Sequence, residues 1–159
     1  GQDFEVAVKT IHAAKEAGAD AIKLQTYTAD TITIDSNKEY FQVTQGTIWD
    51  GTTLYKLYQK AYTPWEWQPK LKQIAEELGL ICFSSPFDKA AVDFLELMNV
   101  PAYKIASFEI VDLPLIEYVA SKGKPIILST GIASKEEVAE AVEVCCRACN
   151  NQLALLKCT

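Results

Sequence analysis

The chain has 159 residues, of which 49% are hydrophobic and 23% are charged, and its formal net charge is −6. This length allows one domain with a sizeable core, and the acidic balance argues against a nucleic-acid partner because binding phosphates requires a basic face. No apolar run reaches the roughly 20 residues needed to cross a bilayer, so we expect no membrane partner and a cytoplasmic location.

The first part of the chain predicts a helix, a strand and a long connection. Residues 2–17 carry apolar side chains near helical spacing, and Gly18 follows as a helix stop. Residues 21–24 form a short buried-strand candidate. Residues 27–62 then separate this strand from its helix, are rich in aromatic side chains and contain a short helix over 54–61. Connections of this length are usually functional, so we expect this one to cover a substrate; a structural or oligomer-facing role is the alternative.

The rest of the chain alternates helices and strands. Residues 64–78 predict a helix that begins with a capping box, with Thr63 as N-cap, Pro64 at the first position and Glu66 at the third. We expect strands at 80–83, 103–105, 126–128 and 153–156, and helices that open at Asp88, Asp112 and Ser134.

This alternation predicts an α/β fold with a parallel sheet covered by helices. From residue 80 onward the strands recur about every 20 to 30 residues, as in (βα)₈ TIM barrels. A complete barrel needs about 250 residues, so 159 residues accommodate only part of one. We therefore predict a partial barrel that corresponds to about strands 2 to 6 of the eight.

Polar side chains follow the predicted strands at their carboxyl ends, which share one edge of a parallel sheet and form the reactive surface of such folds. A lysine ammonium suits phosphate or carboxylate, hydroxyls add hydrogen bonds, and a glycine such as Gly131 lets the backbone approach a ligand closely. For any single serine, a hydroxyl satisfied by nearby backbone is the alternative. A further polar tip is Lys157-Cys158-Thr159. We predict an anion site made of Lys23, Ser85, Lys104, Ser107 and Ser129.

Two more polar residues lie near this edge. Gln25 is two residues beyond Lys23, and Glu109 is two residues beyond Ser107. Period-two alternation places each pair on one strand face, provided that the strands continue that far. Glu109 can bind a sugar hydroxyl or move a proton; the alternative is a solvated loop carboxylate.

The cysteines and the histidine do not have the spacing of a metal site. Cys145 and Cys149 are one helical turn apart, but no second pair lies near them in the sequence, and His12 falls within the first helix. We expect His12 to be a surface or helix-packing residue, and the thiols to be reduced and to fill small apolar volumes. The five cysteines are Cys82, Cys145, Cys146, Cys149 and Cys158.

Taken together, the motifs at the strand ends resemble the sialic acid synthase family over essentially all 159 residues. The motifs are GADAIKLQ at 18–25, CFSSPF at 82–87, PAYKIASFE at 101–109 and GKPIILSTG at 123–131. Within that family, Trp49-Asp50-Gly51 and the run AYTPWEWQP at 61–69 look like the pseudaminic acid synthase branch. The neuraminate branch lacks that run and usually has glycine where Ala106 and Phe108 stand.

The resemblance implies a barrel transferase that joins phosphoenolpyruvate to an open-chain amino sugar, here 2,4-diacetamido-2,4,6-trideoxy-altrose, and yields a nonulosonic acid and phosphate. A divalent metal, manganese or magnesium, would polarise the sugar aldehyde, with ligands outside this chain. The full-length protein would be a homodimer. The resemblance assigns phosphoenolpyruvate to Lys23, Ser85, Lys104, Ser107 and Ser129, the sugar to Gln25 and Glu109, and catalytic roles to Lys104 and Glu109.

Compared with the family, residues 1–159 are expected to form an incomplete synthase barrel domain. The first strand with its glutamate, the last strands, the two metal-binding histidines and the small C-terminal domain would lie outside it, so we expect this piece alone to be inactive. Three alternatives remain: an N-acetylneuraminate synthase acting on N-acetylmannosamine, a Schiff-base aldolase using Lys104 or Lys157, and a non-catalytic module that binds a phospho-ligand.

Overall fold

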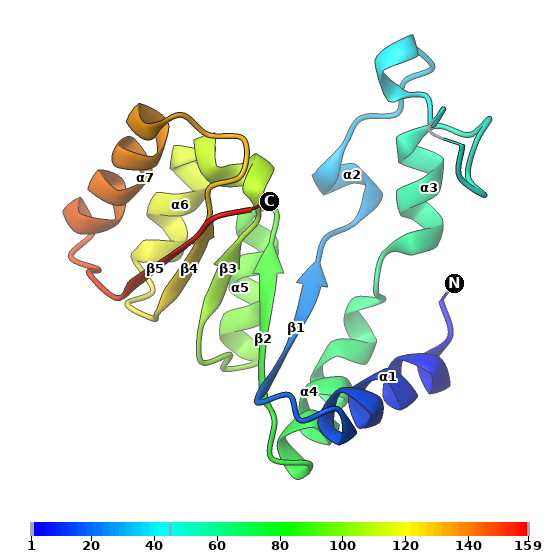
Figure 1. Ribbon diagram of the computed structural model, residues 1–159, viewed down its shortest axis with the longest axis horizontal. Coiled ribbons are helices and arrows are strands. Elements are labelled where there is room, and N and C mark those ends of the chain that lie inside the picture. Colours follow the sequence, from blue (N-terminus) through cyan, green and yellow to red (C-terminus); the bar gives the residue numbers. More distant parts are fainter. Residues whose placement is uncertain (1, 45, 159) are drawn as a thin grey trace.

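The computed structural model describes residues 2–44 and 46–158, which contain five parallel strands in a single sheet (Figure 1). The order of the strands in the sheet follows their order in the chain, and each neighbouring pair is parallel. Helices connect them, so the predicted α/β fold and partial barrel are confirmed. The strands are β1 (Ala21–Thr26), β2 (Ile81–Pro86), β3 (Tyr103–Ile105), β4 (Ile126–Ser129) and β5 (Leu153–Leu156).

Most helices begin where the sequence predicts. The side chains of Asp88 and Asp112 accept hydrogen bonds from backbone N–H groups of the first turn, and Ser134 and Glu137 form the predicted capping box. The α-helices are α1 (Phe4–Glu16), α2 (Ala29–Ile32), α3 (Leu54–Ala61), α4 (Gln68–Glu77), α5 (Lys89–Leu97), α6 (Leu113–Ala120) and α7 (Lys135–Arg147). The 3₁₀ turns are η1 (Glu39–Phe41), η2 (Trp65–Trp67) and η3 (Ser107–Val111).

The predicted capping box of a helix over 64–78, with Thr63 and Glu66, is wrong. A 3₁₀ turn, η2, follows Pro64, and α4 begins only at Gln68. Pro69 explains the difference, because inside a helix that started at 64 it would lack the N–H for one backbone bond and would clash with the preceding turn. In α4 it lies in the first turn, where no donor is needed.

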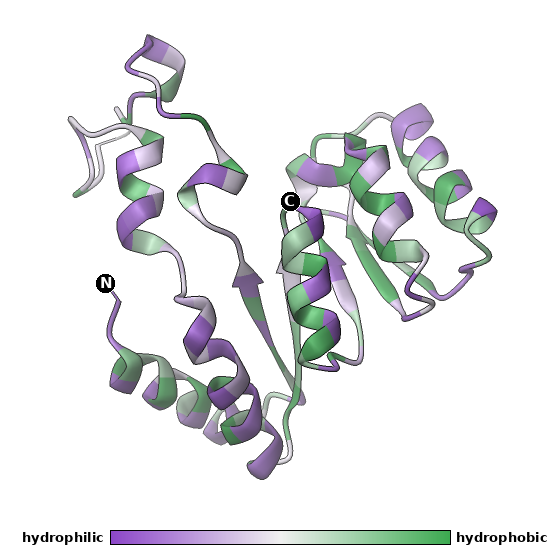
Figure 2. Ribbon diagram, turned by 180° about the vertical axis from the view of Figure 1, so that it is seen from behind, coloured by the Kyte–Doolittle hydropathy of each residue, from purple (hydrophilic) through white to green (hydrophobic). Residues whose placement is uncertain are grey.

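One face of the sheet packs against helices and holds the core. Tyr103, Ile105, Ile126 and Leu128 point from β3 and β4 into a buried cluster with residues of α5, α6 and α7. A second cluster joins Cys82 of β2 to α1 and α4. α5 and α6 lie behind the strands in Figure 1 and come to the front in Figure 2, where hydrophobic residues mark the side of these helices that faces the sheet.

The residues that alternate with the core positions point to the opposite face. On β1 and β2 these are Lys23 and Gln25, with Ser85 beside Gln25 in the strand register. On β3 the alternating residue is Lys104, between the fully buried Tyr103 and Ile105. The polar residues predicted for the site thus share one face and one edge of the sheet.

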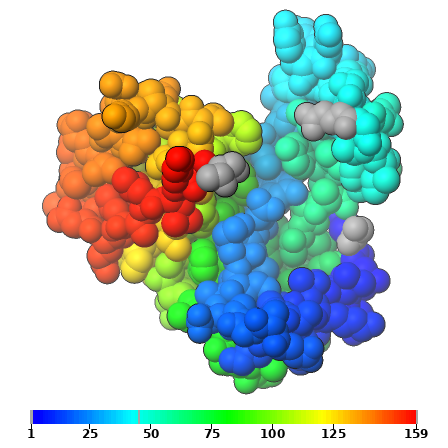
Figure 3. All heavy atoms as spheres, viewed as in Figure 1, coloured from blue at the N-terminus to red at the C-terminus, as the bar shows by residue number. Residues whose placement is uncertain are grey.

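The long connection between β1 and α4 forms a separate excursion, residues 27–62. It contains α2, η1 and the predicted helix α3, and an antiparallel bridge between Gln42 and Thr53 closes its outer part. The excursion rises beyond the carboxyl end of β1 (Figure 1). In the space-filling view a hollow separates it from the loops after β3 and β4 (Figure 3).

The cysteine prediction holds for two of the five thiols. Cys82 and Cys145 are buried, and burial raises the pKa of each to about 11. Cys146, Cys149 and Cys158 are exposed, which contradicts the prediction that they fill apolar volumes. Cys145 points from α7 into the core, so the next residue, Cys146, points outward. Cys149 follows the end of the helix in a left-handed conformation with φ 60°.

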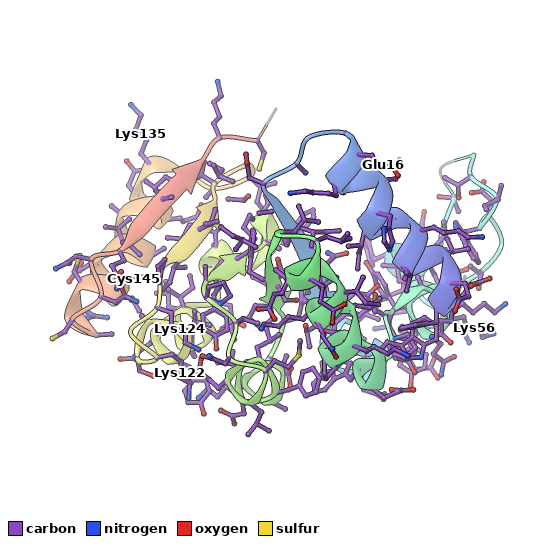
Figure 4. All side chains as sticks on the ribbon, turned by 90° about the horizontal axis from the view of Figure 1, so that it is seen from below. Glu16, Lys56, Lys122, Lys124, Lys135 and Cys145 are labelled. Carbon is purple, nitrogen blue, oxygen red and sulfur yellow. The ribbon has the colours of Figure 1, made fainter. Side chains whose placement is uncertain are left out.

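Polar side chains form a network at the amino-terminal end of β3 and β4. The Tyr103 hydroxyl donates to Glu96 at 2.5 Å, and Lys124 forms an ion pair with the same carboxylate at 2.6 Å. Burial by itself would raise the pKa of Glu96, but the bonds from Lys124 and Tyr103 outweigh it and lower the pKa. Lys122 and Lys124 lie near each other at this end (Figure 4). The network lies at the opposite end of the strands from the predicted site.

Candidate active site at the carboxyl ends of the strands

Lys104 has a fixed position on the open face of the sheet. It is 9% exposed, and its ammonium Nζ donates to Ser129 Oγ at 2.6 Å and to the Ile105 carbonyl oxygen at 2.7 Å. Burial lowers the pKa of Lys104, and the positive charge of Lys23 lowers it further. The ammonium is therefore a partly desolvated cation that two hydrogen bonds hold between β3 and β4, and an anionic ligand there would stabilise its charge.

Gly131 lets the loops after β3, β4 and β5 meet. A Cβ atom at this position would lie 2.7 Å from Ser107 Oγ and 2.8 Å from Cys158 Cβ, too close for any side chain. The sequence suggested that this glycine makes room for a ligand, whereas here its surface is in contact with two protein side chains. We call Lys104, Ser107, Ser129 and Cys158, grouped around Gly131, the anion cluster.

Cys158 is a member of the anion cluster that the sequence prediction missed. A hydrogen bond with Ser129 lowers the pKa of the thiol against the effect of desolvation, and the Gly131 N–H, Ser107 and the charge of Lys104 add to the lowering. Strand alternation could have identified it, because Ser129 pairs with Leu156 and Cys158 is two residues further on the same side. Thr159, the last residue of that predicted tip, lies outside the described residues.

Lys157 does not belong to this cluster. It borders a cavity between β5 and the start of α7, together with Leu155, Thr130 and Val138. It therefore projects to the helix side of the sheet, opposite to Cys158. This position removes Lys157 as the imine-forming lysine of an aldolase that acts at the anion cluster, and leaves Lys104 for that alternative.

The other predicted anion ligands lie on the neighbouring strands. Ser85 is 1% exposed and is the register partner of Gln25, while Lys23 is the partner of Phe83. Burial lowers the pKa of Lys23 as it does that of Lys104. All five predicted phosphoenolpyruvate residues thus lie at one edge, and a hydrogen bond joins Lys104 to Ser129.

A cavity of about 360 Å³ brings the two predicted sugar residues together. It lies beside the anion cluster, because its lining includes Ala106, which precedes Ser107, and Glu109, whose carboxyl interacts with the charge of Lys104. Glu109 reaches it by an unexpected route. The predicted alternation from Ser107 along a strand is wrong, because β3 ends at Ile105 and residues 107–111 coil into η3. We call this cavity the aromatic pocket; its lining is Gln25, Tyr27, Ile32, Tyr58, Phe87, Ala106, Phe108 and Glu109.

Within the described residues, Glu109 Oε2 is a buried oxygen that accepts no hydrogen bond. Burial raises the pKa of the carboxyl, and the nearby charge of Asp112 also raises it. The N–H of Glu109 itself and the charge of Lys104 act in the opposite direction. A buried acceptor without a partner in the wall of a cavity is a candidate to receive a hydrogen bond from a ligand.

Aromatic side chains form the outer wall of the pocket. The Tyr27 ring meets Tyr58 edge to face at 5.6 Å and Phe87 at 5.4 Å between ring centroids. The indole N–H of Trp65 donates to the Tyr27 carbonyl oxygen at 3.1 Å, which anchors the backbone after β1. The sequence predicted that residues 27–62 cover a substrate but did not name individual rings as site residues, although Tyr27 continues the alternation of Lys23 and Gln25.

The described residues do not contain a metal centre. Residues 2–44 and 46–158 bring no three histidine, cysteine, aspartate or glutamate side chains together in a way that could hold an ion. His12 is exposed on α1, as expected for a surface residue. In the same part of the chain no helix is both long and apolar enough to span a membrane.

A parallel α/β barrel wall with a cationic hydroxyl cluster and a pocket at its carboxyl edge defines the general class of (βα)-barrel proteins. Within that class the chain belongs to the NeuB family, whose family model matches residues 10–159.

Two curated relatives share one name. The chain is 52% identical over 157 residues to "Pseudaminic acid synthase" of Helicobacter pylori and 48% identical over 156 residues to the protein of the same name from Campylobacter jejuni serotype O:2. These alignments cover 99% and 98% of the chain but 46% and 45% of the relatives, so the chain spans about half their length.

Among solved structures, an N-acetylneuraminic acid synthetase from Leptospira borgpetersenii superposes with a TM-score of 0.84 at 29% identity. The superposition covers 99% of this chain and 50% of the solved chain.

Proposed function

We propose that the full-length protein containing this chain is a transferase that forms a nonulosonic acid from phosphoenolpyruvate and an amino sugar, and that it is a pseudaminic acid synthase. The observation that carries this proposal is the position of the anion cluster beside a pocket whose buried Glu109 oxygen lacks a partner. The anion cluster suits a small anionic ligand, and the pocket suits a molecule that has both polar and apolar groups. Membership of the NeuB family and the names of the two bacterial relatives support the same reaction.

In this proposal the lysines and serines hold phosphoenolpyruvate. Lys104 and Lys23 offset the charges of the phosphate and the carboxylate, and Ser85, Ser107 and Ser129 donate hydrogen bonds to their oxygens. The lowered pKa values of both lysines support this role, because a dianion would restore the interactions that burial removes.

In the proposed reaction the methylene carbon C3 of phosphoenolpyruvate forms a bond to the sugar aldehyde carbon, whose oxygen takes up a proton. Water then adds to C2, and the C2–O bond to phosphate breaks, so that inorganic phosphate leaves and a 2-keto acid remains. Glu109 and Gln25 contact the sugar. The raised pKa of Glu109 suits a carboxyl that accepts a hydrogen bond from a sugar hydroxyl or takes the proton of the adding water.

The divalent metal and the homodimer implied by the resemblance belong to the proposal for the full-length protein. In this proposal the metal ligands are those that the resemblance places outside residues 1–159. Removal of metal with a chelator should abolish product formation, and added manganese or magnesium should restore it. Product formation in the chelator would show that the metal part of the proposal is wrong.

The proposal is tested by incubating the full-length protein with phosphoenolpyruvate and the diacetamido sugar, and measuring phosphate and the nine-carbon acid. Lys104→Met should raise the KM for phosphoenolpyruvate by at least about 10-fold, the loss of one charged hydrogen bond. Lys135→Met is the matched control, because Lys135 projects into solvent from α7 (Figure 4).

Three outcomes would contradict the proposal. Preferred turnover of N-acetylmannosamine would indicate an N-acetylneuraminate synthase. Saturable binding of phosphoenolpyruvate without product from either sugar would indicate a binding module. Trapping of pyruvate on Lys104 by borohydride would indicate a Schiff-base aldolase.

A further inference from the structure

The aromatic pocket has a polar side and an apolar side, and the two sides come from different parts of the chain. Gln25 and Glu109 supply polar groups from the strand ends. Phe108 faces the same cavity from η3, while Ile32 and Tyr58 reach it from the excursion. The cavity therefore offers hydrogen-bonding groups near the anion cluster and hydrocarbon surface further out.

We propose that Tyr58 and Phe108 make this pocket selective for a sugar that carries methyl-bearing substituents, in preference to one that carries hydroxyls at the same positions. The inference rests on the proposed function and deepens it. The diacetamido sugar has two acetamido groups and a methyl carbon C6, whereas N-acetylmannosamine has one acetamido group and hydroxyls at C4 and C6. Aromatic rings favour burial of the methyl groups and leave the hydroxyls without partners.

Tyr27 supports this wall but is too enclosed to be its selective part. It is 7% exposed and lies between the rings of Tyr58 and Phe87. Burial, together with the neighbouring Tyr58, raises the pKa of its hydroxyl. Tyr58 is only half-buried, and Phe108 is 73% exposed, so these two rings have surface left to cover a ligand.

The outer part of the excursion borders α3, the helix that carries Tyr58, but does not line the aromatic pocket. Leu54 and Leu57 of α3 share a second cavity with Trp49 and Val43, apart from the aromatic pocket. The Val43 N–H donates to the Thr52 carbonyl oxygen at 2.9 Å, which closes this segment against the start of α3. Trp49 therefore lines a different cavity, and Tyr58 is the residue of α3 that lines the aromatic pocket.

The experiment compares kcat/KM for the two sugars in the full-length protein, with phosphoenolpyruvate saturating. Tyr58→Ala should lower kcat/KM for the diacetamido sugar by at least about 10-fold more than for N-acetylmannosamine, the range expected when a pocket loses contact with one or two methyl groups. Phe108→Ala should shift the ratio in the same direction, and Tyr58→Phe should keep it. The KM for phosphoenolpyruvate should not change.

Tyr40→Ala is the matched control, because Tyr40 lies on the same excursion, is 88% exposed and borders the second cavity. If Tyr58→Ala does not fold, Phe108→Ala decides the question, since its ring is largely in solvent. Equal losses for both sugars, or an unchanged ratio in both alanine variants, would refute the inference. A wild-type protein that turns over neither sugar would instead refute the proposed function, and the inference with it.

Discussion

Replacement of Glu109 by glutamine separates a ligand-binding role of this residue from a structural one. The change keeps the size of the side chain and removes its charge. If the buried Oε2 is reserved for a ligand, the carboxylate destabilises the empty protein, and Glu109→Gln should make the protein more stable and less active. A carboxylate that holds the fold together would give the opposite change in stability.

The magnitude follows from the environment of the carboxyl. A buried acceptor without a partner costs about 1–3 kcal/mol, and the charge of Lys104 together with the N–H of Glu109 offsets part of that cost. We expect Glu109→Gln to raise the free energy of unfolding by about 1 kcal/mol near neutral pH, because an amide is easier to desolvate than a carboxylate. Loss of a group that binds the sugar or moves a proton should lower kcat/KM by about 100-fold.

The stability difference between Glu109→Gln and wild type should depend on pH. The pKa of Glu109 is raised in the folded state, so the folded protein binds this proton more tightly than the unfolded chain does. The destabilisation is absent below the unfolded pKa of about 4.3, grows as the pH rises toward the folded pKa, and is constant above it. The stability difference between variant and wild type should therefore be present at about pH 8 and vanish near pH 4.

Urea unfolding of the full-length protein at these two pH values measures the difference, and the synthase assay measures activity. Glu117→Gln, at an exposed position on α6, is the control and should change neither quantity. A variant that is less stable than wild type at about pH 8, or a stability gain that is equal at both pH values, would refute the reasoning.

Two further substitutions test the packing around the site and the network at the opposite end of the strands. Gly131→Ala would place a Cβ 2.7 Å from Ser107 Oγ and 2.8 Å from Cys158 Cβ. We therefore expect the free energy of unfolding to fall by about 1–3 kcal/mol, and the KM for phosphoenolpyruvate to rise more than the KM for the sugar. Wild-type kinetics would contradict the close packing. Tyr103→Phe removes the 2.5 Å hydrogen bond to Glu96 and should cost about 1–2 kcal/mol in urea unfolding while kcat stays unchanged. A fall in kcat without a fall in stability would show that this network acts on the site.

Features set by neighbouring residues could be predicted from the sequence. The caps at Asp88, Asp112 and Ser134 depend on residues within the next turn, and the structure has all three. The start of α4, which the prediction placed too early, is also set locally, because Pro69 disfavours a helix that begins at residue 64.

The fold and the chemical character of the site were also present in the sequence. Apolar strands followed by lysine and serine indicate a parallel sheet with an anion site at one edge, because strand direction alone brings these ends together. Only the tertiary structure decided which side chains share a cavity. Glu109 and Gln25 line one pocket although residues 107–111 leave the strand direction and coil into η3. Cys158 lies beside Ser129 through the register of β5, and Tyr58 reaches the pocket from α3, which is distant in the sequence from η3. Such contacts depend on the packing of segments far apart in the chain, which local patterns do not encode.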